Sequence, residues 1–356
     1  METRERRRRG GRLLRLLLLF VLLVVLAAGG TGYYIYDQLQ PVEAQGESKN
    51  VLIPTGTSVR QIGQLLEEAG LVRNGELFSY YVRYKGVAPQ LKAGEYAFTP
   101  GMSHDEIIQN MVEGNVVVRA TRFTIPEGWN VEQIAEHLAS EGIVDKDAFL
   151  HEVNHGSFPE FPFVAEIPQD EQRSNRLEGY LFPETYEVKE GASEREIIER
   201  MLAQFQKEWQ EEWNEQLKQH NLTMDQAVTL ASIVEREVAV DKERAKVAGV
   251  YYNRIRENWP LQADATVQFL LGKQKERLTY DDLKVDSPYN TYANPGLPPG
   301  PIANPGRESL AAVINPEVHD YFFYVTKKDG TQEHYFSRTL QEHNANDAKS
   351  RQNGGG

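Results

Sequence analysis

Val51-Leu-Ile-Pro-Thr-Gly-Thr-Ser-Val-Arg-Gln-Ile-Gly-Gln-Leu-Leu66 recurs later in the chain as Phe123-Thr-Ile-Pro-Glu-Gly-Trp-Asn-Val-Glu-Gln-Ile-Ala-Glu-His-Leu138. Each copy has a short apolar run, then a Pro-x-Gly turn, then apolar residues at helical spacing. That order predicts a strand followed by an amphipathic helix. Two such copies predict an α+β fold. Because one small unit buries little surface, we expect the copies to pack on each other or on the domain that follows.

A second pair of matching segments follows the first. Gly101-Met-Ser-His-Asp-Glu-Ile-Ile-Gln-Asn-Met111 aligns with Gly191-Ala-Ser-Glu-Arg-Glu-Ile-Ile-Glu-Arg-Met201, and Tyr96 aligns with Tyr186. The separation is larger than in the first pair, which predicts an insertion in the second copy, in the Pro- and Phe-rich segment 156–176. The strand-turn-helix order resembles LysM-type glycan-binding modules, in topology alone.

A basic arm and an apolar run precede the repeat. Residues 1–15 hold seven arginines, and residues 16–35 carry no charge. Such a run is long enough to cross roughly 30 Å of hydrocarbon. Arginine-rich flanks stay in the cytoplasm, so we expect a single-pass span with the N-terminus inside and the body outside the cell membrane. A cleaved signal peptide is the alternative, since Ala27-Ala-Gly-Gly30 supplies small residues, although Tyr33, Tyr34 and Tyr36 favour a retained anchor.

The composition excludes several classes of protein. The chain has 356 residues and a formal net charge of −13, which the basic arm makes less negative than the rest of the chain is. An acidic body argues against nucleic acid as a partner, because phosphate binding depends on Lys and Arg. The absence of cysteine excludes a lipidated thiol, a disulfide framework and a cysteine nucleophile.

Turn and cap signals divide the chain further. A charged helix is expected from Met201 to His220, Thr223 and Asp241 should cap the next two helices, and Lys328-Asp-Gly330 should close a hairpin. The expected parts are a basic arm at 1–15, a transmembrane helix at 16–36, a linker at 37–50, a LysM-like unit at 51–120, a second repeat unit with the insertion at 121–220, a mixed α+β catalytic domain at 221–349 and a disordered tail at 350–356.

Candidate acids occur in Thr229-Leu-Ala-Ser-Ile-Val-Glu-Arg-Glu-Val-Ala-Val240. On a helical wheel Glu235 and Glu237 both lie at the border of the apolar stripe. A carboxyl held against aliphatic side chains has a raised pKa and can act as a general acid. Leu230 and Ile233, beside Glu237, are bulkier than Ala231, beside Glu235, which favours Glu237. The alternative is that both are ordinary boundary residues of a surface helix.

Two other motifs allow a functional and a structural interpretation. The Gly/Pro loop from Tyr289 to Gly306 displays Tyr and Asn side chains on a stiff backbone, which suits a ligand site but equally a cover over the core. His151-Glu-Val-Asn-His155 matches the H-E-x-x-H motif of zinc proteases. Gly156 ends the predicted helix at once, where a zinc protease helix continues toward a third ligand, so we expect no metal site.

Several strings together resemble one family. Glu178-Gly-Tyr-Leu-Phe-Pro-Glu-Thr-Tyr186, Ala231-Ser-Ile-Val-Glu-Arg-Glu237, Leu261-Gln-Ala-Asp264, Tyr289-Asn-Thr-Tyr292 and Gly296-Leu-Pro-Pro-Gly-Pro-Ile302 are similar to the MltG (YceG-like) family of membrane-anchored endolytic murein transglycosylases. The similarity is dense from about residue 51 to 344. It departs from the family in loops and at Arg236, where Lys is frequent.

The resemblance implies a reaction and its residues. Glu237, the second glutamate of Glu-x-Glu, would be the sole acid and base that cleaves the β-1,4 bond between N-acetylmuramic acid and N-acetylglucosamine inside a glycan strand. The muramyl C6 hydroxyl would attack its own anomeric carbon and leave a 1,6-anhydro end. No metal or organic cofactor is needed. The matching strings supply candidate substrate-binding residues: Glu178, Tyr180, Glu184, Gln262, Asp264, Tyr289, Asn290 and Tyr292.

The same resemblance implies a setting in the cell wall. Its partners would be peptidoglycan glycan strands, the membrane and penicillin-binding wall synthases, and its role would be to terminate the elongation of nascent strands. Two alternatives are a non-catalytic glycan-binding scaffold of wall synthesis and a muramidase that uses water.

Overall fold

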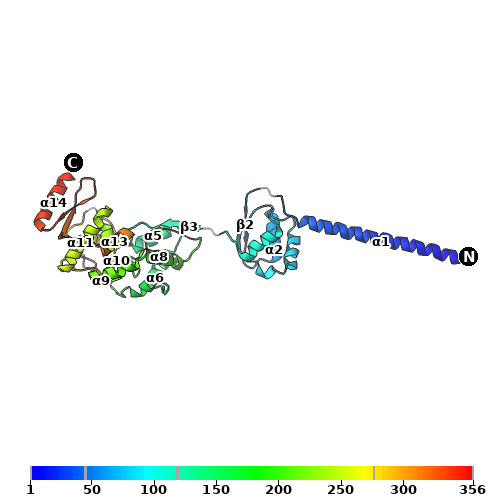
Figure 1. Cartoon of the computed structure of the whole chain (residues 1–356), viewed down its shortest axis with the longest axis horizontal. Helices are drawn as coiled ribbons and strands as arrows, with labels where there is room; N and C mark the ends of the chain where they lie inside the picture. Colours follow the sequence, from blue (N-terminus) through cyan, green and yellow to red (C-terminus); the bar gives the residue numbers. More distant parts are fainter. Residues whose placement is uncertain (1, 44–45, 118–119, 276, 355–356) are drawn as a thin grey trace. The chain divides into compact units, whose positions relative to one another are not determined.

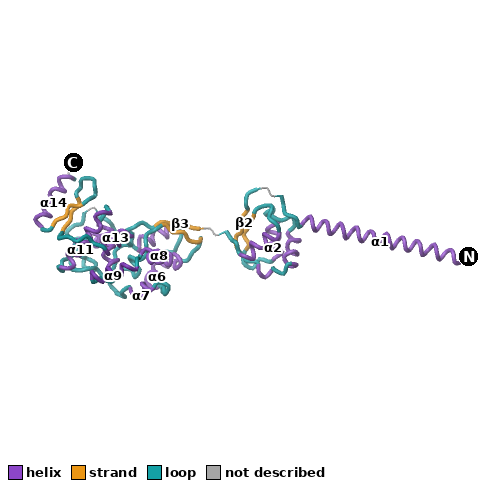
Figure 2. Tube along the Cα trace, viewed as in Figure 1, coloured by secondary structure: helices purple, strands orange, loops and turns teal. Residues whose placement is uncertain are grey.

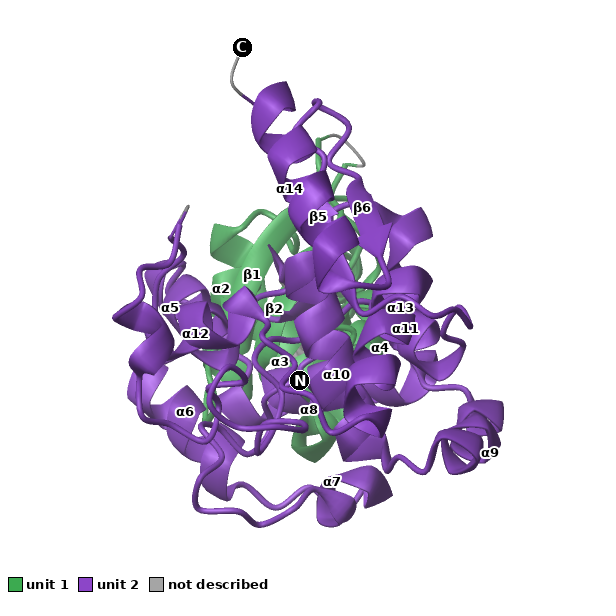
Figure 3. Ribbon diagram, turned by 90° about the vertical axis from the view of Figure 1, so that its left-hand side faces the viewer, with its two compact units in different colours: residues 1–119 green, residues 120–356 purple. Residues whose placement is uncertain are grey.

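The computed structural model describes residues 2–43, 46–117, 120–275 and 277–354, with backbone alone for residues 2–15. The chain divides into two compact units, Met1–Arg119 and Ala120–Gly356, coloured separately in Figure 3. Helices predominate, and the described strands form three two-stranded sheets (Figure 2). These features confirm the predicted α+β class.

The first unit begins with a long helix, α1 (Glu2–Gln38) (Figure 1). Its segment Leu16–Gln38 is long and apolar enough to cross a membrane, and it is the one such segment among the described residues. The leucines and valines from Leu16 to Leu26 are exposed. An exposed apolar helix at the N-terminus suggests a membrane anchor. A signal sequence would have the same properties.

The rest of the first unit is a small layered module. Strands β1 and β2 pair in antiparallel fashion. In the sequence, helices α2 and α3 lie between these strands, and α4 follows β2. Helices α2 and α3 meet at Gly63 and Gly75, where a Cβ atom on either glycine would lie within 2.2 Å of the other's carbonyl oxygen. The bounds are β1 (Lys49–Ile53), α2 (Val59–Glu68), α3 (Gly75–Tyr84), η1 (Ala88–Gln90), β2 (Gly94–Phe98) and α4 (His104–Glu113).

The second unit opens with the same order of elements. Val51 faces Tyr96 across the first strand pair, and Phe123 faces Tyr186 across the second, so residues that align in sequence also pair in space. The additional residues of the second copy lie between α6 and β4. The bounds are β3 (Ala120–Thr124), α5 (Val131–Ser140), α6 (Lys146–His155), α7 (Pro162–Glu166), β4 (Thr185–Lys189) and α8 (Glu194–Glu208). The likeness to LysM modules stays a prediction.

The remaining elements carry the candidate acid. They are α9 (Glu211–His220), α10 (Met224–Glu237), α11 (Asp241–Arg256), α12 (Asp264–Leu270), η2 (Asp282–Lys284), α13 (Arg307–Ile314), β5 (Phe323–Thr326), β6 (His334–Ser337) and α14 (Leu340–Asn353). The predicted cap at Thr223 is confirmed, because its side chain accepts the Gln226 N–H in a capping box. The predicted hairpin is confirmed by the antiparallel pairing of β5 with β6.

The predicted strand and amphipathic helix are present in both copies, as β1 with α2 and β3 with α5, and α3 and α6 are second helices that the sequence did not predict. Two local predictions were wrong. The helix expected from Met201 to His220 breaks after Glu208, because Trp209 has an extended backbone and packs edge-on against Trp213. Asp241 is the first residue of α11, and its carboxylate accepts a bond from Arg244 where a cap would bind backbone N–H groups.

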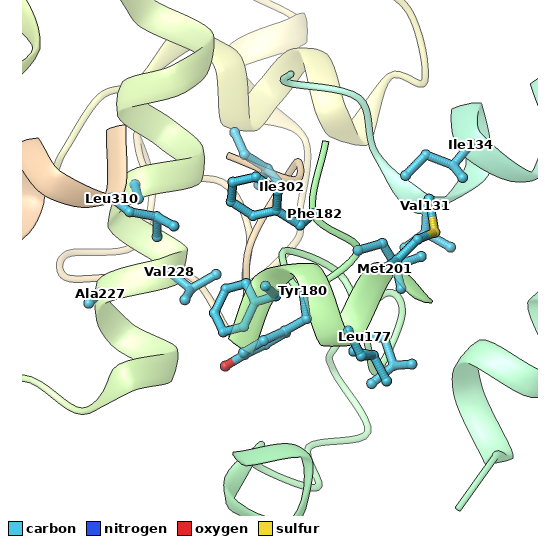
Figure 4. Close-up of a cluster of buried hydrophobic side chains, with 14 of the residues drawn as sticks. Val131, Ile134, Leu177, Tyr180, Phe182, Met201, Ala227, Val228, Ile302 and Leu310 are labelled. Atoms are coloured by element: carbon cyan, nitrogen blue, oxygen red, sulfur yellow. The ribbon is translucent and has the colours of Figure 1, made fainter. Parts of the chain in front are cut away.

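One hydrophobic core joins the second repeat to the helices that follow. Figure 4 shows Val131 and Met201 from the repeat with Val228 from α10, Ile302 from the Gly/Pro loop and Leu310 from α13. The second copy therefore packs on the region that follows it, as expected. Residues on both sides of position 220 share this core, so the repeat can fix the position of α10.

Candidate active site

Glu237 is the last residue of α10, and the buried body of that helix fixes its position. Leu230, Ile233 and Val234 have no exposed surface. The helix ends because Val238 turns to an extended backbone, which is needed for the chain to enter α11. The Glu237 side chain is half-buried and lines a pocket.

Both carboxylate oxygens of Glu237 have partners from distant parts of the chain. Oε1 accepts the Ala265 N–H at 3.2 Å, from the first turn of α12. Oε2 accepts the Tyr324 hydroxyl at 3.1 Å, from β5. The Tyr324 oxygen is 2.6 Å from the hydroxyl oxygen of Tyr251, a fully buried residue of α11. Elements α12 and β5 therefore hold the carboxylate directly, and α11 holds the Tyr324 hydroxyl.

The surroundings raise the pKa of Glu237. Burial is the largest cause, and the negative charge of Asp264 acts in the same direction. The Ala265 N–H, the Tyr324 hydroxyl and the positive charge of Arg254 oppose this rise. A carboxyl with a raised pKa keeps its proton nearer to neutral pH, which a general acid requires.

The hydrogen bonds of the two carboxylate oxygens differ in whether the partner can both donate and accept. The Ala265 N–H can only donate, so it always requires a lone pair on Oε1. The Tyr324 hydroxyl can donate to a charged carboxylate or accept from a protonated one, and Tyr251 can supply the complementary bond. The site can therefore satisfy Glu237 in either protonation state, as a residue that acts first as acid and then as base needs.

The pocket around Glu237 has a volume of about 300 Å³. Its lining combines polar and apolar side chains, which suits a sugar, because a sugar has hydroxyl edges and a C–H face. Besides Glu237, the lining has the polar or charged residues Arg254, Gln262, Asp264, Tyr292, Tyr324 and His343 and the apolar residues Phe323 and Leu340.

Three of the predicted substrate-binding residues lie in this pocket. Gln262 has a left-handed backbone with φ of 48°, and its N–H donates to the Thr291 carbonyl at 3.1 Å. The Tyr292 hydroxyl donates to Asp264. The string Leu261–Asp264 and the string Tyr289–Tyr292 thus bind each other, and together they bring Gln262, Asp264 and Tyr292 to Glu237.

The other predicted substrate-binding residues lie elsewhere. Glu178 is fully buried and accepts the Val131 N–H, and burial raises its pKa to about 8. Buried Tyr180 donates to Asp225 at 2.9 Å. Glu184 is exposed and accepts the Thr185 N–H. These three side chains are not among the described residues that line the Glu237 pocket.

Tyr289 and Asn290 also serve the structure of the loop. The Tyr289 hydroxyl accepts the Ser174 N–H at 3.1 Å, and the Asn290 amide donates to the carbonyls of Leu283 and Val285. Both residues are buried. The Gly/Pro loop is therefore a cover over the core for most of its length and reaches the pocket at Tyr292.

Glu235 has a buried side chain whose carboxylate binds groups of the protein itself. Its carboxylate forms an ion pair with Arg244 at 3.1 Å, and it accepts the Gly306 N–H at 3.0 Å. Six per cent of its side chain is exposed. Neither glutamate is a free surface residue, and of the two Glu237 is the one in the pocket. Asp241 also pairs with Arg244, at 3.0 Å.

The sequence did not reveal the two tyrosines that are hydrogen-bonded in series to Glu237, or the apolar residues of the pocket lining. Tyr324 was placed in the predicted hairpin, but nothing in its spacing connects it to Glu237. Tyr251 and Phe323 gave no signal beyond their place in a helix and a strand.

In the H-E-x-x-H segment, the rings of His151 and His155 stack, with their centroids 4.7 Å apart. The described residues hold no group of three or more His, Cys, Asp or Glu side chains that could bind a metal ion.

These features define a class: an α+β protein with an N-terminal apolar helix and a pocket built round a half-buried glutamic acid. The chain belongs to the YceG-like family, whose model matches residues 51–349. This confirms the resemblance found in the sequence.

Known relatives agree with this assignment. A Bacillus subtilis (strain 168) protein named endolytic murein transglycosylase is 36% identical over 322 residues, 88% of each chain. A protein of the same name from Streptococcus pneumoniae serotype 2 is 35% identical over 343 residues, 89% of this chain and 61% of that protein. The crystal structure of a yceG-like protein from Listeria monocytogenes is 36% identical with a TM-score of 0.56, and the match covers 84% of this chain and 98% of that one.

Proposed function

We propose that this chain is an endolytic murein transglycosylase, which cleaves the β-1,4 bond between N-acetylmuramic acid and N-acetylglucosamine within glycan strands. The observation that carries the proposal is that Glu237, whose pKa is raised, is held by two hydrogen bonds in a pocket lined by polar and apolar side chains. The names of the relatives at 35–36% identity support it.

The proposed reaction uses Glu237 twice. Its proton goes to the glycosidic oxygen as the bond to the muramyl anomeric carbon breaks. The carboxylate then takes the proton of the muramyl C6 hydroxyl, whose oxygen bonds to the anomeric carbon and closes the 1,6-anhydro ring. Gln262, Asp264 and Tyr292 are proposed to hold the sugar, and the charge of Asp264 would stabilise the oxocarbenium-like transition state.

Asp264 also supports a second candidate, the muramidase. A glycosidase needs two carboxylates, one for the leaving group and one for a nucleophile or water, and this pocket holds Glu237 and Asp264. Product analysis separates the candidates. The full chain should be incubated with purified murein, and the ends of the released strands identified by mass spectrometry. Anhydro ends on strands of many lengths support the proposal. Reducing muramyl ends support the muramidase, and intact murein supports a scaffold.

Tyr324→Phe is expected to change the pH dependence of cleavage. The Tyr324 hydroxyl stabilises the charged form of Glu237, so its loss should raise the pKa of Glu237 further. Cleavage requires protonated Glu237, so the basic limb of kcat/KM against pH should move to higher pH. Activity near neutral pH should stay within about tenfold of wild type, because one hydrogen bond is lost.

Tyr335→Phe is the matched control for this change. Tyr335 lies in β6 of the same hairpin, and its hydroxyl meets the exposed Asn353 side chain. This variant should keep the wild-type profile. A basic limb that stays in place or moves to lower pH in Tyr324→Phe would contradict the role of the hydroxyl.

Membrane topology is part of the proposal. Seven arginines before the apolar segment favour an N-terminus in the cytoplasm and a body outside. A protease added to intact spheroplasts should therefore digest the body. Protection of the body, or a mature N-terminus near Gly29, would refute the anchored orientation.

The proposed role also rests on the family resemblance. An enzyme anchored at the outer face of the cell membrane could terminate nascent strands beside a penicillin-binding wall synthase, and the LysM-like units would position the glycan.

A further inference from the structure

The Glu237 pocket is too small for an internal cut to depend on it alone. Its volume of about 300 Å³ lies at the lower end of the range for ligand sites. A cut inside a strand requires sugars on both sides of the broken bond. If the proposed function is right, further sugars must lie on the rim of this pocket.

Two exposed apolar side chains, Leu340 and Trp259, line this pocket or contact a residue that lines it. Among the described residues of the second unit, the exposed large apolar side chains are Trp259, Tyr280, Val318 and Leu340. Leu340 lines the pocket itself. The Trp259 ring, 44% of whose residue surface is exposed, lies 5.9 Å from the ring of Phe323, which also lines the pocket. Trp259 therefore places an exposed aromatic ring beside a residue of the pocket lining.

The position of Trp259 is fixed by its neighbours. Asn258 has a left-handed backbone with φ of 55°, which turns the chain sharply at the end of α11. The Trp259 N–H then donates to the Arg254 carbonyl at 2.8 Å, and its ring packs against Phe322 at 5.2 Å. The Arg254 guanidinium lies 5.6 Å from the centre of the Phe323 ring. A surface held in place before binding costs little side-chain entropy when a ligand arrives.

We propose that Trp259 and Phe323 form a stacking subsite for an N-acetylhexosamine of the strand whose neighbouring bond lies at Glu237. Flat aromatic side chains offer a large apolar surface at low entropic cost, which suits the C–H face of a pyranose ring. Continuity with the pocket identifies the occupant, because Phe323 belongs to both. The subsite would determine how well long strands bind, and it would contribute nothing to proton transfer.

Binding to an inactive chain tests this subsite separately from the reaction. The full chain with Glu237→Gln serves as the parent, and its affinity for purified, stem-free glycan strands is measured by calorimetry. Adding Trp259→Ala should weaken binding about tenfold. Trp259→Leu, which keeps apolar packing on Phe322 but lacks a flat ring, should weaken it similarly. Trp259→Phe should restore most of the affinity.

Tyr280→Ala is the matched control, since Tyr280 is an exposed aromatic residue that does not line the Glu237 pocket. It should bind as the parent does. Parent-like binding by Trp259→Leu would overturn the subsite, even if Trp259→Ala fails to fold. The proposed function is tested separately: it fails if the wild-type chain leaves no anhydro ends. In that case, weaker binding by the Trp259 variants would still support a glycan subsite.

Discussion

Glu237→Gln is expected to slow glycan cleavage by about a thousandfold or more. Glutamine has the same volume and can still accept the Ala265 N–H, but it can neither give nor take a proton near neutral pH. In the proposed mechanism one residue performs both proton transfers, so no other group can replace it. The measurement is the rate of appearance of new strand ends from purified murein.

Two controls make this result specific. Circular dichroism and the melting temperature of Glu237→Gln should match those of the wild type. Glu235→Gln should instead lower stability, because it weakens the buried ion pair with Arg244, while the folded fraction keeps its activity. Near-normal cleavage by Glu237→Gln together with a folded but inactive Glu235→Gln would show that the wrong glutamate has been assigned.

Arg173→Ala is expected to cost the second unit about 3–5 kcal/mol of unfolding free energy, as removal of one partner of a buried ion pair generally does. Arg173 pairs with Asp225 at 2.9 Å, with 2% and 10% of the two side chains exposed. It also donates to the carbonyls of Asn175 and Glu178. The substitution would leave a buried carboxylate without its cation and would detach the insertion of the second repeat from the first turn of α10.

Tryptophan fluorescence during denaturant unfolding measures this effect on the second unit alone. The four tryptophans of the chain, Trp129, Trp209, Trp213 and Trp259, all lie there. Lys218→Ala is the control, because its pair with Glu215 is exposed and should contribute less than about 1 kcal/mol. Equal unfolding free energies for the two variants would refute the structural role of Arg173.

The sequence predicted the parts of this structure that depend on local pattern. The wheel through α10 favoured Glu237 over Glu235, and the structure places Glu237 in a pocket where burial raises its pKa. The repeat predicted that equivalent strands recur. The partner of Glu237 on β5 could not be predicted, because Tyr324 is brought to it by tertiary packing.

Polar motif residues were the less predictable part of the site. Glu178 and Asn290 belong to strings as specific as those of Gln262 and Asp264, but their side chains bind backbone groups inside the protein. A polar side chain that must satisfy a buried N–H or carbonyl is as restricted as one that binds a ligand. The sequence pattern cannot separate these two requirements, whereas exposure in a pocket can.

The central claim is that the muramyl C6 hydroxyl, and not water, attacks the anomeric carbon while Glu237 moves the protons. Digestion of murein by the wild-type chain in water labelled with heavy oxygen tests it most directly. The account predicts muramyl ends that carry no label and are lighter by one water than hydrolysed ends, and Glu237→Gln should form such ends about a thousandfold or more slowly. Heavy oxygen at the muramyl anomeric carbon would contradict the account and would assign Glu237 and Asp264 to a muramidase.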